Sequence, residues 1–243
     1  MQPTKKNKEL IFFMKIKKLL QYFSPFEWGL WGCSVAAIAL SSCLGENFHP
    51  LTLLASLLGV TSLIFIAKGN VLGQFLVSIF SILYALVSFE QRYYGEMITY
   101  VFMSLPASVA ACVTWLKNPS KKGKSEVKVA TVSAMKLFWI AIIAIVVTTV
   151  FYFILDFFQT NNLIVSTVSV ATSFLASALL ILRSRYYALA YAANDVVLIV
   201  LWVYSSFSSL AYLPMVVCFV AFLFNDLYAF YNWKRMQKRQ KED

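Results

Sequence analysis

The run YALAYAANDVVLIVLWVYS, residues 187–205, holds one charged residue, Asp195, and neither glycine nor proline. As a helix, a run of this length extends for about 30 Å, which is the thickness of the hydrocarbon core of a bilayer. A transmembrane β-strand would be shorter and would alternate polar with apolar residues. The run therefore predicts a transmembrane helix.

The rest of the chain repeats this pattern. Hydrophobic residues make up 60% of the 243 residues and charged residues 13%, whereas a soluble domain is closer to about half and about a quarter. Further apolar segments of similar length lie at 26–44, 51–67, 71–88, 97–116, 137–157, 163–182 and 210–233. We therefore predict an all-α polytopic membrane protein with eight transmembrane helices.

The basic residues indicate the orientation. With eight helices, every one of the 21 Lys and Arg residues except Arg92 falls in a loop or tail on the same side of the membrane. Loops rich in Lys and Arg stay in the cytoplasm, so both termini are expected there. The net charge of +10 indicates no nucleic-acid partner, because it is carried by the loops that set the orientation.

The residues needed for catalysis or metal binding are scarce. The chain has one histidine, His49, and its four cysteines lack metal-binding spacing. It also lacks the glycine-rich phosphate-binding motif of ATPases, so it does not hydrolyse ATP itself. We therefore expect no enzyme, no cofactor and no metal site.

The polar segment 118–135 divides the predicted helices into two halves. At an offset of 118 residues the halves superpose three pairs of aromatic residues, Tyr84 on Trp202, Tyr94 on Tyr212 and Trp115 on Trp233. The repeated units are predicted at 50–116 and 161–233, with a loop and a linking helix at 117–158. Because each unit has three helices and one helix joins them, the second unit returns in the same orientation, so the repeat is parallel.

These units belong to one transmembrane domain, 26–236, which also has an additional first helix at 26–44. A basic cytoplasmic segment, 1–25, precedes the domain, and a cytoplasmic tail, 237–243, follows it. Tryptophans near the ends of apolar segments are expected in the membrane interface. They are Trp28, Trp31, Trp115 and Trp233. Glu96 is expected in solvent, beside Arg92.

Polar side chains near the middle of the run 187–205 predict a site. A charged residue at that depth costs about 2.5–3.5 kcal/mol, so Asp195 and its neighbour Asn194 should face a cavity, a partner or water. Tyr187 and Tyr191 precede Asp195 by eight and four residues, so they share its helix face, and Trp202 lies near that face. The face thus combines stacking surfaces with hydrogen-bonding groups.

Two further amides, Gln74 and Asn225, lie at membrane depth, and Asp226 repeats the Asn-Asp pair. Aromatic rings with fixed amides are typical of a site for a flat heterocycle that carries amide and ribose groups, and a sugar could use them equally well. Two alternatives stay open: Asp195 bonds only a neighbouring helix, and Asp226 pairs with a nearby Lys or Arg or is solvated.

Two stretches carry a family resemblance: 67–115, beginning AKGNVLGQFLVSIFSILYALVSFEQRYYGE, and 186–236, beginning YYALAYAANDVVLIVLWVYSSF. They resemble the PnuC family of nicotinamide riboside transporters, in its Gram-positive form. The resemblance implies a fold like that of SWEET sugar transporters and assembly as a homotrimer in the bacterial cytoplasmic membrane. It also implies facilitated diffusion of nicotinamide riboside, which a cytoplasmic kinase then traps by phosphorylation.

In that family the substrate contacts a tryptophan and an asparagine three residues apart, and an amide from another helix. The resemblance places Tyr191, Asn194 and Gln74 at these positions. Since Tyr191 replaces an indole with a phenol, a related carrier of thiamine, riboflavin or deoxynucleosides stays open. Proton coupling also stays open, because Asp195 could titrate during the transport cycle. The predicted substrate-binding residues are Asn194, Tyr191, Gln74, Trp202, Asp195, Tyr187, Tyr84 and Asn225. Tyr191 and Trp202 would stack on the pyridinium, Asn194 and Gln74 would bind the carboxamide or ribose, and Asp195 would balance the charge.

Overall fold

The structure, a computed structural model, describes residues 21–44, 48–120 and 123–242. Most of the basic segment predicted at 1–25 lies outside these residues. The elements, in chain order, are α2 (Pro25–Ser42), α3 (Pro50–Ala67), α4 (Val71–Glu90), α5 (Tyr94–Thr99), the π-helical η1 (Tyr100–Ser104), α6 (Leu105–Lys117), β1 (Pro119–Ser120), β2 (Gly123–Val127), α7 (Ala134–Phe157), α8 (Leu163–Ile181), α9 (Tyr187–Ser208), the 3-10 turn η2 (Leu210–Tyr212) and α10 (Leu213–Glu242).

The predicted all-α polytopic membrane fold is confirmed. In the described part of the chain, 7 helical segments are long and apolar enough to cross a membrane, and α5, η1 and α6 together form one of them. The helix α2 is also 18 residues long and packs beside α3 and α10, but it is not among the seven. An eighth span at α2 therefore stays a prediction.

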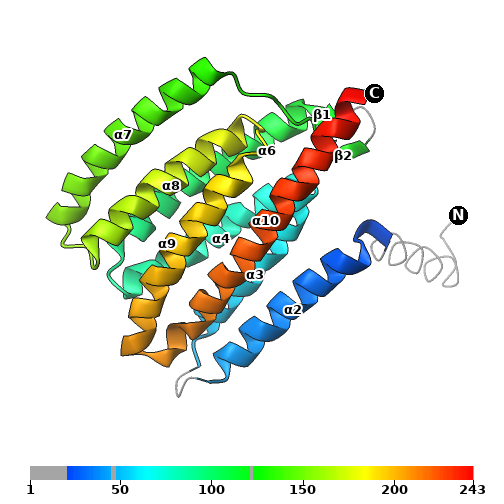
Figure 1. The fold of residues 1–243 in the computed structure, drawn as a ribbon. Helices are drawn as coiled ribbons and strands as arrows, with labels where there is room; N and C mark the ends of the chain where they lie inside the picture. Colours follow the sequence, from blue (N-terminus) through cyan, green and yellow to red (C-terminus); the bar gives the residue numbers. More distant parts are fainter. Residues whose placement is uncertain (1–20, 45–47, 121–122, 243) are drawn as a thin grey trace, which may run out of the picture.

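The long helices form two three-helix bundles (Figure 1). One contains α3, α4 and the α5–η1–α6 helix, and the other contains α8, α9 and α10. The first helix of each bundle packs against the last helix of the other, α3 against α10 and α8 against α6. The linking helix α7 packs mainly on α8 at the edge of the molecule.

Two of the three residue pairs that the predicted repeat superposes touch each other. The indole Nε1 of Trp202 donates a 2.7 Å hydrogen bond to the hydroxyl of Tyr84, and the rings of Trp115 and Trp233 lie 5.4 Å apart. Two residues related by a twofold axis can touch only where the axis passes between them. These two contacts therefore fit a parallel repeat whose axis runs along the helices.

The same contacts correct the expectation that the Trp115 and Trp233 side chains lie in the membrane interface. Their exposed fractions are 2% and 0%, and Trp233 Nε1 donates a 3.0 Å hydrogen bond to the carbonyl of Ile66. A tryptophan near the end of an apolar segment has the same sequence pattern whether it packs on lipid headgroups or on the neighbouring bundle. Only the packing distinguishes the two.

A short turn positions the start of α4. Gly69 adopts φ +66°, a left-handed conformation that favours glycine, and Asn70 Oδ1 accepts a 2.9 Å hydrogen bond from the amide of Leu72. The turn reverses the chain after α3, so that Gln74 lies one turn into α4 and faces the other bundle.

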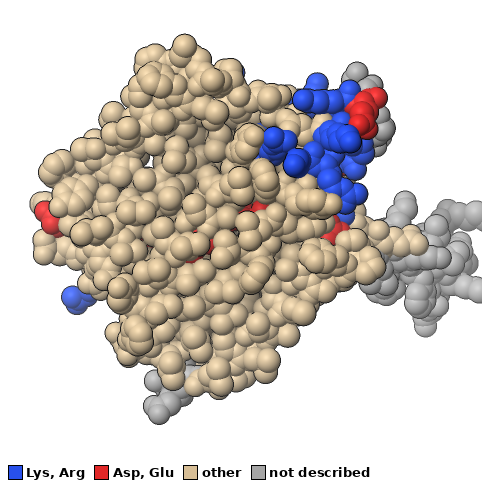
Figure 2. All heavy atoms as spheres, viewed as in Figure 1, with Lys and Arg blue, Asp and Glu red and all other residues tan. Residues whose placement is uncertain are grey.

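The basic end of the molecule is more ordered than the sequence indicated. Two antiparallel strands, β1 and β2, lie within the segment predicted as a loop. The helix α10 continues to Glu242, beyond the apolar segment that ends at 233, and Gln240 Nε2 donates a 2.8 Å hydrogen bond to Glu126 of β2. Lys and Arg side chains gather over this end (Figure 2).

Candidate functional site

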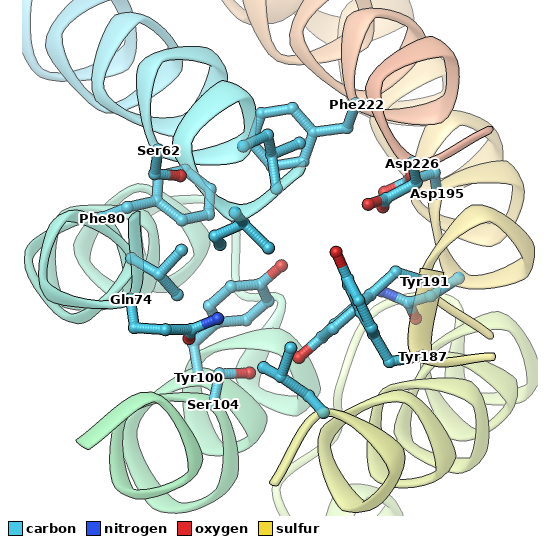
Figure 3. A pocket seen from close by; sticks show the side chains of 15 residues that line it. Ser62, Gln74, Phe80, Tyr100, Ser104, Tyr187, Tyr191, Asp195, Phe222 and Asp226 are labelled. Atoms are coloured by element: carbon cyan, nitrogen blue, oxygen red, sulfur yellow. The ribbon is translucent and has the colours of Figure 1, made fainter. Parts of the chain in front are cut away.

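A buried cavity lies between the two bundles (Figure 3). One wall comes from the first bundle and includes Ser62, Gln74, Phe80, Tyr100 and Ser104. The opposite wall comes from α9 and α10 and includes Tyr187, Tyr191, Asn194, Asp195, Phe222 and Asp226. The cavity thus lies where the pathway of a transporter built from two parallel repeats is expected.

The cavity is narrow. The space open to the centre of a water molecule is about 50 Å³, which is room for a few water molecules. Ligand pockets usually have volumes of about 300 Å³ or more. A ligand of nucleoside size therefore requires the lining side chains, or the bundles themselves, to move apart.

Hydroxyl groups of α8 fix the orientation of Asn194. Its Oδ1 accepts hydrogen bonds from the side chains of Thr172 at 2.7 Å, Ser173 at 3.0 Å and Ser169 at 3.3 Å. Because three donors hold the oxygen, the Nδ2 amino group is the part of the amide left for a ligand. Asn194 is 2% exposed, so this donor is held in place before any ligand arrives.

Gln74 has the opposite character. Its side chain is 0% exposed, and among the described residues neither its Oε1 nor its Nε2 has a hydrogen-bond partner. An unpaired buried amide costs about 1–3 kcal/mol. Figure 3 shows this amide pointing into the cavity from α4, where a ligand could supply the missing partners.

Two carboxyl groups meet in the opposite wall. Asp195 of α9 and Asp226 of α10 are each 2% exposed, and their carboxyl groups lie within hydrogen-bonding distance of each other (Figure 3). No ion pair involves either residue in the part of the chain that the structure describes, and Asp195 Oδ2 has no hydrogen-bond partner there. The alternative that Asp226 is solvated or paired with a Lys or Arg is therefore wrong.

Aromatic rings line the space between the Gln74 amide and the carboxyl groups of Asp195 and Asp226. The Tyr191 hydroxyl lies 3.2 Å from Ser177 Oγ, and the Tyr187 ring packs at 4.8 Å on Trp233. Tyr100 comes from the π-helical segment of the first bundle. Such segments are rare and often lie at functional sites. The rings offer stacking surfaces on both sides of the cavity.

The cavity brings together five of the eight predicted site residues, Gln74, Tyr187, Tyr191, Asn194 and Asp195. The other three, Tyr84, Trp202 and Asn225, do not line it. Tyr84 and Trp202 bond to each other between the bundles, and Asn225 Nδ2 donates a 2.8 Å hydrogen bond to Ala221 in its own helix.

Other residues that line the cavity were not among the predicted site residues. The repeated Asn-Asp pair could have identified Asp226, because it marks α9 and α10 alike. Tyr100 and Ser104 carry no such pattern, since the π-helical turn that exposes both to the cavity is not visible in the sequence. Glu96 was misplaced: it is 0% exposed, and no ion pair within the described residues joins it to Arg92.

Comparisons with known proteins agree with this architecture. The chain is 28% identical over 200 residues to the nicotinamide riboside transporter PnuC of Neisseria mucosa, covering 79% of this chain and 76% of that protein. It is 25% identical over 191 residues to the nicotinamide riboside transporter PnuC of Haemophilus influenzae, covering 78% and 81%.

The crystal structure of the vitamin B3 transporter PnuC superposes with a TM-score of 0.76 at 22% identity, covering 90% of this chain and 94% of that one, which shows the same fold. The model of the nicotinamide mononucleotide transporter family matches residues 49–235. This match includes both bundles and every residue of the cavity. The chain therefore belongs to the nicotinamide mononucleotide transporter family, and the resemblance to PnuC transporters is confirmed.

Proposed function

We propose that this protein carries nicotinamide riboside across a membrane and binds it in the cavity between the bundles. The observation that carries the proposal is the enclosed combination of an unpaired amide, aromatic rings and a carboxyl pair. Nicotinamide riboside has a cationic aromatic ring, a carboxamide and ribose hydroxyls, and each has a matching group here. The names of the two relatives support the same substrate.

The charge of the cavity favours the riboside over the mononucleotide for which the family is named. A phosphate group is usually bound by Arg, Lys or helix N-termini. None of the described residues that line the cavity is Lys, Arg or His, and two of them are Asp. A phosphate beside two carboxyl groups would meet like charge in a medium of low dielectric constant, which is unfavourable.

Each wall has a separate task in the proposed binding. Tyr191 and Tyr187 stack on the nicotinamide ring beside the carboxyl pair. The Nδ2 group of Asn194, held by the α8 hydroxyls, donates to a carboxamide or ribose oxygen. Gln74 accepts from and donates to the other end of the ligand.

Transport follows from relative motion of the bundles. The walls of the cavity belong to different bundles, so rocking one against the other opens the cavity to either side in turn. The contacts Tyr84–Trp202 and Trp115–Trp233 join the bundles near opposite ends of the helices, so opening the cavity toward one end would break the contact at that end. We propose facilitated diffusion, with a cytoplasmic nicotinamide riboside kinase trapping the product.

The proposed setting is the cytoplasmic membrane of a bacterium, with both termini in the cytoplasm. The gathering of Lys and Arg at the end where α3, α6, α8 and α10 terminate supports this orientation (Figure 2). With both termini in the cytoplasm, α2 would be the eighth span. A homotrimer, as the family resemblance implies, is also part of the proposal, and the largely exposed apolar surface of α7 is available to lipid or to neighbouring copies.

A second candidate is a carrier of another vitamin or nucleoside. It is favoured by Tyr191, whose hydroxyl bonds to Ser177 at a position where a tryptophan is expected from the family resemblance. Binding of labelled nicotinamide riboside, thiamine, riboflavin and deoxyadenosine to the purified protein separates the two candidates. The proposal predicts the tightest binding for nicotinamide riboside, and preference for any of the others would replace it.

Uptake into proteoliposomes tests the transport itself. Protein-dependent entry of labelled nicotinamide riboside is expected, and it should be lost in Asn194→Ala with the protein still folded. The matched control is Asn232→Ala, which removes an amide bonded to the carbonyl of Ala67 outside the cavity and should transport normally. Equal uptake by the two variants would remove the cavity as the site.

A further inference from the structure

We propose that Asp195 and Asp226 act together as a charge filter, which selects ligands whose ring is positively charged over neutral rings of the same shape. The inference rests on the proposed function and extends it, because it assigns the specificity of the site to a pair of residues. Shape and hydrogen bonding alone would accept the neutral ring equally well.

The pair is placed to act on whatever fills the cavity. Asp195 and Asp226 come from α9 and α10, which pack along each other, and both line the cavity beside the rings of Tyr187 and Tyr191. Both side chains reach toward the cavity at the upper right of Figure 3, across from Gln74. A ring stacked on Tyr191 would lie next to both carboxyl groups.

None of the described residues that line the cavity supplies a positive charge to balance the pair. The polar groups that face the pair from the other elements are uncharged: Ser62 of α3, Gln74 of α4, and Tyr100 and Ser104 of η1. Two carboxylates at this separation repel each other unless a proton or a cation neutralises one of them. A cationic ligand relieves this repulsion, whereas a neutral ligand leaves it unchanged.

An organic cation fits the pair better than a metal ion does. Hard cations such as Ca²⁺ take six to eight oxygen ligands. Within the described residues, no group of three or more His, Cys, Asp or Glu side chains could hold a metal. The aromatic rings beside the pair attract a delocalised cation through their faces, and a hydrated metal ion would gain little from them.

Two ligands of the same shape test how the charge of the ring affects binding. Benzamide riboside has the shape, aromatic ring, carboxamide and ribose of nicotinamide riboside, with carbon in place of the charged ring nitrogen. The wild-type protein should bind nicotinamide riboside at least about thirtyfold more tightly, as expected for a charge that pairs with a buried carboxylate. Equal affinities of the wild-type protein for the two ligands would overturn the inference.

Isosteric variants test whether Asp195 and Asp226 cause the preference for the charged ring. Asp226→Asn and Asp195→Asn should each lower the affinity for nicotinamide riboside by about tenfold or more and change that for benzamide riboside by less than about threefold. Asp156→Asn, at the exposed end of α7, is the matched control and should leave both affinities unchanged. If the Asn variants weakened both ligands equally, so that their ratio persisted, the pair would be structural and the inference wrong.

The outcomes separate the inference from the function on which it rests. If the wild-type protein bound neither riboside but bound another vitamin, the proposed function would fail. If it bound both ribosides equally well, transport of nicotinamide riboside would stand and the charge filter would fall. Since the wild-type comparison uses no variant, equal affinities for the two ribosides would overturn the inference even if an Asn variant does not fold.

Discussion

Replacing Gln74 with methionine should stabilise the ligand-free protein and weaken its binding of nicotinamide riboside. The amide of Gln74 is fully buried, and neither of its polar atoms has a hydrogen-bond partner in the described residues. An unsatisfied buried polar group costs about 1–3 kcal/mol. Methionine has a similar length and no strong hydrogen-bonding group, so Gln74→Met should raise the free energy of unfolding by about that amount.

The same change should weaken binding. If the Gln74 amide makes two hydrogen bonds to the ligand, each contributing about 0.5–1.5 kcal/mol, the variant loses about 1–3 kcal/mol of binding free energy. That loss corresponds to an affinity lower by about 5-fold to 150-fold. Stability and binding thus move in opposite directions, which a purely structural glutamine would not produce.

The assay combines thermal unfolding of the purified protein with equilibrium binding of nicotinamide riboside. A gain of 1 kcal/mol raises the melting temperature of a protein of this size by about 2–4 °C. The control is Gln91→Met: Gln91 Oε1 accepts a 2.6 Å hydrogen bond from Ser205 outside the cavity, so this variant should lose stability and keep its affinity. A lower melting temperature for Gln74→Met with unchanged affinity would show that the Gln74 amide is paired in the free protein and does not bind the ligand.

Three further changes test the packing around the cavity. Tyr84→Phe leaves the buried Nε1 of Trp202 without a hydrogen-bond partner and should lower the free energy of unfolding by about 1–3 kcal/mol with no effect on affinity; weaker binding of nicotinamide riboside would instead place this pair at the substrate. Gly73→Ala puts a Cβ 2.7 Å from backbone atoms of α3 and should destabilise the protein by about 1–3 kcal/mol, whereas Gly32→Ala has no atom within 4 Å and should not. Equal melting temperatures for these two variants would contradict this packing. Thr172→Val removes the 2.7 Å hydrogen bond to Asn194 and should weaken binding about fivefold, measured by titration; unchanged affinity would show that this hydroxyl does not orient the amide.

Hydropathy and charge were sufficient to predict the helices and the clustering of basic residues at one end. The repeat was also visible, because the superposed aromatic residues keep their spacing, and the structure shows why two of the pairs persist: they touch. The strands β1 and β2 and the extension of α10 were not predicted, because their contacts join segments far apart in a polar sequence that hydropathy does not describe.

The site was predictable in part. Asn194 and Asp195 were found because a polar residue within an apolar run is expensive, and the same reasoning found Gln74. The sequence pattern could not separate residues that face the cavity from those that pack between the bundles. Trp202 and Tyr84 were therefore included among the predicted substrate-binding residues. The position of Asp226 depends on how α10 is rotated against α9, which only the packing determines.

The central claim is that nicotinamide riboside binds between the two bundles, and a structure of the complex determined with that ligand tests it most directly. We expect density for the ring against Tyr191, with its charged nitrogen toward Asp195 and Asp226, and for the carboxamide or ribose within hydrogen-bonding distance of Asn194 and Gln74. Density elsewhere, for example against Trp202, or an empty cavity at saturating ligand, would contradict it.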